Sequence, residues 1–189
     1  MAKIIELLRK EHGDIEQMLQ ILEGELSIFD RQQRPDYRIV KAVINYLQDY
    51  PDGCHHPKED MIFEKLRARD PVAAKRIGDL EAEHREEARS LQHIADIIRK
   101  ISLNREVSQQ TFGDALREFI RRHRTHMVME ERFFFPVASS ALRAKDWAEI
   151  DLKWSDTKDS LFSVAMEEKC ESLRDRLLYW THERDERHH

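Results

Sequence analysis

The chain has 189 residues, with 37% charged, 40% hydrophobic and only five glycines and five prolines, a composition that predicts an all-α protein. The formal net charge of −5, with basic residues interleaved among acids, excludes an obvious nucleic-acid-binding surface. No apolar run could span a membrane, the amino-terminal residues do not resemble a signal peptide, and two cysteines form neither a disulfide framework nor a zinc pattern, so we expect a cytoplasmic protein.

The first predicted helix runs from about residue 3 to residue 29. Apolar residues recur at steps of three and four between Ile5 and Leu22, which is the period of an amphipathic helix. His12 lies in the middle of this apolar stripe, so we expect its imidazole to face inward. Residues 32–36 are predicted to connect this helix to the next.

The second predicted helix meets a proline and a glycine at residues 51–53, which should kink or restart it. Pro57 is compatible with the first turn of the resumed helix. His55 and Glu59 are four residues apart, so their side chains share one face of that helix.

The third predicted helix begins at Asp70, with that aspartate as the N-cap and Pro71 at the first helical position. Its inward stripe runs from residue 77 to residue 98 and includes His84. His93 is outside the stripe, and we expect it to be exposed to solvent.

The fourth predicted helix follows a loop at residues 102–108. Its inward stripe contains Phe112, Leu116, Phe119, His123, His126, Glu130, Phe133 and Val137. His126 and Glu130 repeat the four-residue spacing of His55 and Glu59, so each of these segments directs one imidazole and one carboxylate to the same side.

Four long helices with short connections predict an up-down-up-down four-helix bundle, which we assign to residues 1–143. Residues 144–189 are expected to form a C-terminal helical extension, with a short helix at 146–150, a polar turn at 156–160 and a last helix at 162–180. This last helix is expected to pack on the outside of the bundle or against a second copy of the chain, which would make a homodimer.

Six inward side chains could bind metal ions: His12, His55, Glu59, His84, His126 and Glu130. A single histidine on an apolar stripe is more often a hydrogen-bonded core residue than a ligand. Burying all six without a cation would cost on the order of several kcal/mol each, which favours metal binding by the set. The acids that follow the two glutamates, Asp60 and Glu131, are expected to be solvated.

The ligand types restrict the metal. Imidazoles and carboxylates without a thiolate suit iron, manganese, zinc or copper, and the set is too large for one tetrahedral zinc. It fits two octahedral-leaning metals that share the carboxylates, about 3.5–4 Å apart.

The segments around these residues resemble the hemerythrin-like HHE cation-binding family. The resemblance rests on Leu8 to His12, His55 to Asp60, Glu83-His84, His126 to Glu131, and Phe134 to Pro136. It covers about residues 1–143, and the tail beyond Asp146 is similar to an extension in some members.

The resemblance implies a four-helix bundle with a non-haem, carboxylate-bridged centre of two iron ions, for which zinc or manganese could substitute. Glu59 and Glu130 would bridge the irons. His84 and His126 would bind one iron, and His12 and His55 would bind the other.

The chain differs from the oxygen-carrying hemerythrins at two positions. Ala88 stands where they have a second histidine, four residues after the one that matches His84. Glu130 stands four residues after His126, where they bridge with an aspartate five residues after it. These differences imply one nitrogen ligand fewer and room for water, peroxide or nitric oxide at iron. His123 is expected to orient a ligand rather than bind metal.

The functional prediction is a protein that binds or senses oxygen, nitric oxide, peroxide, or iron or redox status. The alternative is an enzyme that reduces peroxide or nitric oxide, or that repairs iron clusters. A ferritin-like oxidase ranks last: Glu81-x-x-His84 has the required spacing, but the predicted bundle contains no second such pair.

Overall fold

A computed structural model of the chain describes residues 2–103, 109–158 and 168–180. The described residues are helical and include no strand, which confirms the predicted all-α class. The helices are α1 (Lys3–Asp30), α2 (Tyr37–Tyr50), α3 (His56–Arg69), α4 (Pro71–Ile77), α5 (Leu80–Ser102), α6 (Gln109–Met129), α7 (Phe135–Ala141) and α8 (Ala144–Lys158), with π-helical turns η1 (Pro51–His55) and η2 (Glu130–Phe134) and a further helix at 168–180.

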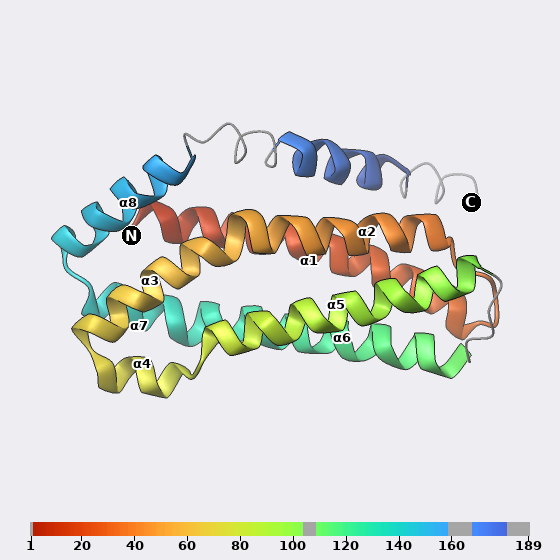
Figure 1. Ribbon diagram of the computed structural model, residues 1–189, viewed down its shortest axis with the longest axis horizontal. Helices are drawn as coiled ribbons and strands as arrows, with labels where there is room; N and C mark the ends of the chain where they lie inside the picture. The colour runs from red at the N-terminus through yellow and green to blue at the C-terminus, as the bar shows by residue number, and fades with distance from the viewer. Residues whose placement is uncertain (1, 104–108, 159–167, 181–189) are drawn as a thin grey trace.

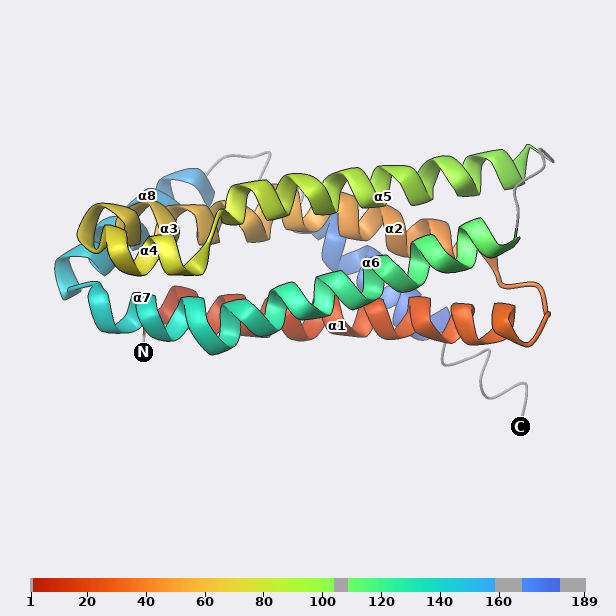
Figure 2. The same ribbon diagram turned by 90° about the horizontal axis from the view of Figure 1, so that it is seen from below.

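Four long rods lie side by side along the molecule (Figures 1 and 2). The first is α1, the second is α2 continued through η1 into α3, the third is α5, and the fourth is α6 continued through η2 into α7. Helix α1 packs against α2 and α6, and α5 packs against the same two helices. Successive rods run in opposite directions (Figure 1).

The interior consists of two apolar clusters with a layer of buried polar residues between them. On α1, Ile5 and Leu8 belong to one cluster, and Ile15 and Met18 belong to the other. His12 lies between them and is buried. The apolar stripe predicted for α1 is therefore present, and its one inward imidazole is held at a fixed height along the rods.

The predicted interruption at residues 51–53 is wrong. The chain continues from α2 through η1 into α3 without leaving the helical path, and Pro57 lies in the first turn of α3. A π-helical turn contains an extra residue, so it can accommodate Pro51, which has no backbone N–H to donate, without ending the rod.

The predicted third helix is two helices. Asp70 caps α4 as expected and accepts a hydrogen bond from the Ala73 amide. Gly78 then ends α4 at φ 109°, a conformation that glycine adopts readily. Asp79 caps α5 through the Ala82 amide, so a second start signal was present in the sequence.

The predicted inward position of Phe133 is also wrong. Its side chain is 61% exposed, whereas Phe134 and Phe135 are fully buried. Turn η2 holds one residue more than an α-helical turn, which shifts the inward face by one position. His93 is exposed, as predicted.

The helix at 168–180 packs along the outside of α1 and α2 (Figure 1), and α8 packs against α3. Cys170 and Leu177 are buried in the larger apolar cluster, and Lys169 pairs with Asp49 of α2 at 2.6 Å. Contact with a second copy of the chain stays a prediction.

The predicted limits of the extension need correction. Helix α8 is longer than the predicted 146–150, and it includes residues 156–158, which were expected to be a turn. Phe162, Ala165 and Met166, which the prediction placed in the last helix, lie outside the described residues, as do residues 104–108 of the predicted loop. Within the described ranges, none of the helices is long and apolar enough to cross a membrane.

Substituting two glycines should have opposite effects on stability. Gly78→Ala forces a side chain into a positive-φ conformation and should lower the free energy of unfolding by about 1–2 kcal/mol. Gly24→Ala lies within α1, where an added Cβ meets nothing within 4 Å, and should raise it by about 0.5–1 kcal/mol. Urea unfolding followed by circular dichroism measures both, and equal effects would contradict the assigned boundary between α4 and α5.

Candidate metal centre

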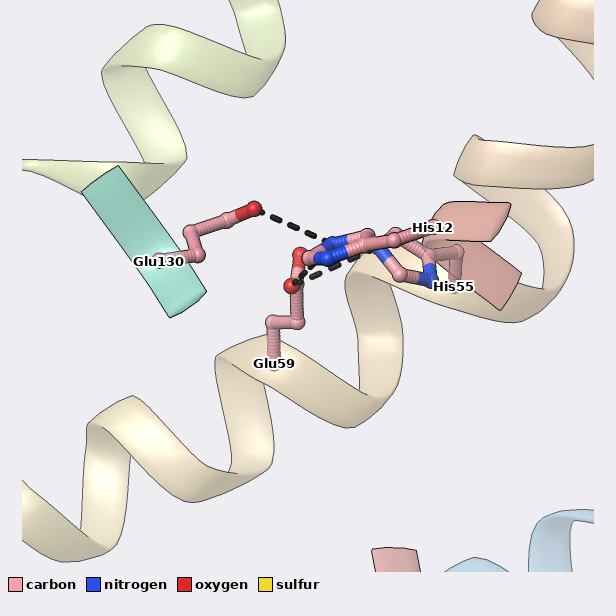
Figure 3. A group of neighbouring side chains, drawn as sticks. All are labelled: His12, His55, Glu59 and Glu130. Atoms are coloured by element: carbon pink, nitrogen blue, oxygen red, sulfur yellow. Dashed lines mark ion pairs between the residues drawn. The ribbon is translucent and has the colours of Figure 1, made fainter. Parts of the chain in front are cut away.

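The structure brings together all six residues that the sequence singled out. His12, His55, Glu59 and Glu130 form one group, and Glu59, His84, His126 and Glu130 form a second. Within each group, one ligand atom from every residue lies within 4.8 Å of the others. All six residues are buried. Figure 3 shows the first group, with side chains from α1, η1, α3 and η2 converging on one point.

A π-helical turn adjoins each histidine–glutamate pair. Turn η1 ends at His55, and Glu59 follows in the first turn of α3. Turn η2 begins at Glu130, four residues after His126. Such turns change the direction of side chains within an otherwise regular helix and are frequent at functional sites.

Each of the two glutamates faces both pairs of imidazoles. The Glu59 Oε1 atom lies 3.3 Å from His55 Nε2 and 3.7 Å from His12 Nε2, while its Oε2 atom lies 3.5 Å from His84 Nε2.

Glu130 has the same arrangement. Its Oε2 atom lies 3.3 Å from His12 Nε2, and its Oε1 atom lies 3.0 Å from His126 Nε2 and 3.8 Å from His84 Nε2. In both glutamates, one oxygen is therefore directed to the His12–His55 pair and the other to the His84–His126 pair. A carboxylate in this position can bridge two ions.

The atoms that face the centre lack hydrogen-bond partners. Among the described residues, the buried atoms without such a partner include both oxygens of Glu59 and Glu130 and the Nε2 atoms of His12, His84 and His126. Each unsatisfied buried group costs about 1–3 kcal/mol or more. Two cations at this point would accept these lone pairs, so the donors present fit a pair of metal ions.

The Nδ1 atom of each of the four imidazoles meets a carboxylate. The pairs are His12 with Glu131 at 3.0 Å, His55 with Glu11 at 2.8 Å, His84 with Asp60 at 3.5 Å, and His126 with Glu83 at 2.8 Å. The contacts of His12, His55 and His126 are hydrogen bonds, whereas that of His84 is an ion pair only. An Nδ1–H group that donates to a carboxylate fixes the tautomer and directs the Nε2 lone pair toward a metal.

The four carboxylates that face Nδ1, here called the outer layer, include two whose environment was predicted wrongly and two that were not predicted. Asp60 and Glu131 were expected to be solvated, but each contacts an imidazole although its side chain is about two-fifths exposed, at 42% and 41% respectively. Glu11 and Glu83 were not predicted. The sequence held no direct signal for them, because each lies beside one histidine in sequence and contacts a different histidine on another rod.

The charge distribution of the centre favours cations. Burial alone would lower the pKa of His12, but the carboxylates of Glu130 and Glu59 beside it raise this pKa to about 10. Burial alone would also lower the pKa of His84, but the nearby carboxylates of Asp60, Glu130 and Glu59 raise this pKa to about 12. Burial raises the pKa of the Glu59 carboxyl, yet the surrounding imidazoles hold it well below its usual value. Without metal, the same attractions would retain protons on the imidazoles.

A buried lysine connects this centre to the C-terminal extension. Lys58 is fully buried, and its ammonium donates to Glu11 Oε1 and to the Cys54 carbonyl oxygen, each at 2.6 Å. The same ammonium lies 4.5 Å from the centre of the Trp154 ring on α8. Since Glu11 also binds His55 Nδ1, the extension covers one part of the outer layer.

A second buried polar group lies beside the centre. His123 Nδ1 is 3.2 Å from Glu87 Oε1, and His56 Nε2 is 3.9 Å from Glu87 Oε2. Burial raises the pKa of Glu87, but the nearby imidazoles of His123, His126 and His56 lower this pKa to about 2. His123 belongs to neither candidate ligand group, so the structure places it beside Glu87 rather than with the six.

A comparison with known protein families is consistent with a metal-binding site. The family model described as the hemerythrin HHE cation binding domain matches residues 3–138. The chain therefore belongs to the hemerythrin HHE cation-binding family, which confirms the resemblance seen in its sequence. Comparisons with curated proteins and with solved structures found no match.

The buried lysine should be far more important for stability than a neighbouring exposed lysine. Lys58→Ala leaves the Glu11 carboxylate buried without its cation and should lower the free energy of unfolding by about 3–5 kcal/mol. Lys65, also on α3, pairs with Glu149 at the surface, and Lys65→Ala should leave stability nearly unchanged. Denaturant unfolding of both variants tests the difference, and similar losses would contradict a buried role for Lys58.

The metal-free protein should become less stable as the pH rises. The folded-state pKa of His12 is raised from 6.5 to about 10, so its stabilising effect is complete below pH 6.5 and is lost as the pH approaches 10. Glu59 acts in the opposite direction: its pKa is lowered from 4.5, so its stabilising effect is present above pH 4.5 and is lost at lower pH. The free energy of unfolding of the metal-free protein should therefore be highest between pH 4.5 and pH 6.5.

Urea unfolding at a series of pH values measures this profile. Glu130→Gln removes one of the charges that raise the pKa of His12, so it should flatten the alkaline side, whereas His93→Ala, at an exposed position, should not. A wild-type profile that is flat from pH 6.5 to 10 would refute the assignment.

Proposed function

We propose that this member of the hemerythrin HHE family holds two non-haem iron ions bridged by Glu59 and Glu130. His12 and His55 would bind one iron, and His84 and His126 would bind the other, with zinc or manganese able to use the same donors. The observation that carries this proposal is that each glutamate directs one oxygen to each pair of Nε2 atoms. The four rods would then form an up-down-up-down bundle within residues 1–143, and residues 144–189 would form the extension.

The chain supplies the donors, their orientation and their isolation from water. Each candidate group contains four residues, two imidazoles and two shared carboxylates, which is fewer donors than an octahedral ion takes. When bound, iron would supply open coordination positions for a small ligand and one-electron redox chemistry. The carboxylates on Nδ1 would hold each imidazole in place, and the apolar clusters on both sides would exclude bulk water.

We propose that the ligand is oxygen, nitric oxide or peroxide, and that the protein binds or senses it. A ferritin-like oxidase is less well supported, because Glu81, which would complete the Glu-x-x-His pair, is 55% exposed and belongs to neither ligand group. Catalytic reduction of peroxide or nitric oxide is the alternative, and turnover in place of stoichiometric binding would establish it.

Metal analysis tests the proposal directly. Protein loaded anaerobically with Fe(II) and desalted should contain about two irons per chain and, after exposure to air, show charge-transfer absorption bands. A His55→Ala/His126→Ala variant should lose most of this iron, while His93→Ala should keep it because His93 is exposed and belongs to neither ligand group. Full iron content in the double variant, or no iron in the wild type, would overturn the proposal.

A further inference from the structure

One of the four carboxylates of the outer layer is paired with a buried lysine. The Lys58 ammonium donates to Glu11 Oε1 at 2.6 Å, and Glu11 Oε2 lies 2.8 Å from His55 Nδ1. Lys58, Glu11 and His55 are 0%, 4% and 2% exposed. A continuous row of buried hydrogen-bonded groups therefore connects the lysine to a candidate metal ligand.

Glu11 is held as a carboxylate in this row. Burial raises the pKa of its carboxyl, but the hydrogen bond with His55 and the charge of Lys58 lower that pKa below its usual value. A negative and a positive charge thus lie side by side in the interior, and the lysine neutralises the carboxylate that supports His55.

The other three carboxylates of the outer layer are in contact with water. The side chains of Glu131, Asp60 and Glu83 are 41%, 42% and 48% exposed. Solvent screens charges at such positions, whereas a charge in the interior is screened much less. Among the charged groups that support the four imidazoles, Lys58 and Glu11 are therefore the least screened from the metal centre.

The position of the lysine is fixed on three sides. Its ammonium also donates to the carbonyl oxygen of Cys54, the residue before His55 in turn η1, at 2.6 Å. The ring of Trp154 on α8 lies 4.5 Å from the ammonium and packs against the smaller apolar cluster. The charge of Lys58 is consequently held at one place relative to His55 and is shielded from water by α8.

Stability alone does not account for a charged pair at this place. A buried ion pair contributes little net stability compared with apolar side chains of similar volume, because removing both charges from water is costly. Neutral side chains could therefore fill the same space. The location of the pair, directly behind a ligand imidazole, indicates that its charges act on the metal centre.

A charge behind a metal ligand changes the reduction potential of the metal. Fe(III) becomes Fe(II) when it takes up one electron, so a nearby positive charge favours the reduced ion and a negative charge favours the oxidised ion. A carboxylate on Nδ1 also makes the imidazole a stronger donor, which again favours the oxidised ion. Lys58 opposes both effects of Glu11.

We propose that Lys58 is a positioning residue that raises the reduction potential of the iron held by His12 and His55, acting through Glu11 on the His55 imidazole. This inference rests on the proposed two-metal centre. The iron held by His84 and His126 is supported by solvent-exposed carboxylates instead, so the two irons are unequal, and the His12–His55 iron takes up the first electron.

A redox titration tests the effect of the charge. Iron-loaded protein is titrated from Fe(III) to Fe(II) with redox mediators, and its charge-transfer absorption measures the oxidised fraction. Lys58→Met removes the charge and keeps nearly the same side-chain length. In the first one-electron step it should raise the ratio of oxidised to reduced iron at a fixed potential at least about tenfold, which is a midpoint lower by about 59 mV.

Two further variants separate a charge effect from structural damage. Lys65→Met makes the same change on α3 at the surface, where Lys65 pairs with Glu149, and should keep the wild-type midpoint. Lys58→Met/Glu11→Gln replaces the pair by two neutral side chains and should return most of the way to the wild-type midpoint. A wild-type midpoint in Lys58→Met, or an equally lowered midpoint in the double variant, would overturn the proposal.

Iron content distinguishes failure of this inference from failure of the proposed function. Wild-type protein that binds no iron would refute the metal centre itself. Lys58→Met with the wild-type iron content and an unchanged midpoint would refute only the role of Lys58. If Lys58→Met loads less iron, Glu11→Gln takes its place: it removes the negative charge, so a raised midpoint supports the proposal and an unchanged or lowered one contradicts it.

Discussion

The arrangement of the four rods depends on two buried carboxylates. Glu59 and Glu130 are fully buried, lie close together between the two apolar clusters, and have no hydrogen-bond partner among the described side chains. Two negative charges in an apolar interior are tolerable only if positive charge surrounds them closely. Each of the four rods contributes one imidazole that faces these carboxylates, and this polar layer separates the apolar core into two clusters.

The carboxylates that face the Nδ1 atoms of the four imidazoles complete a closed circle of contacts around the rods. His12 on the first rod contacts Glu131 on the fourth, and His55 on the second rod contacts Glu11 on the first. His84 on the third rod contacts Asp60 on the second, and His126 on the fourth rod contacts Glu83 on the third. Every neighbouring pair of rods is thus joined through one of the four imidazoles of the candidate metal centre. The same contacts therefore orient the imidazoles and align the helices, since a rod that slid along its axis would break two of these contacts.

The sequence was informative where one helix face carried the signal. His55 with Glu59 and His126 with Glu130 could be predicted because the four-residue spacing is a property of a single helix. The outer acids could not, because Glu11 and the others act on a histidine of another rod, and only the assembled fold decides which one. The π-helical turns were missed for a related reason: Pro51 predicts a break by its missing N–H, and nothing local shows that packing on both sides will keep the rod continuous.

The same circle contains the asymmetry that distinguishes the two halves of the centre. Glu11, which holds His55, is buried and bound by the buried Lys58 beneath Trp154, so its charge is neutralised and its position fixed. Asp60, which faces His84, is 42% exposed, and its contact at 3.5 Å is longer than the other three. Asp60 and His84 also line a pocket of about 320 Å³ between α3 and α5. The His55 side of the circle is therefore fixed by buried charge, to which α8 contributes through Trp154, whereas the His84 side is supported by a carboxylate that is open to solvent.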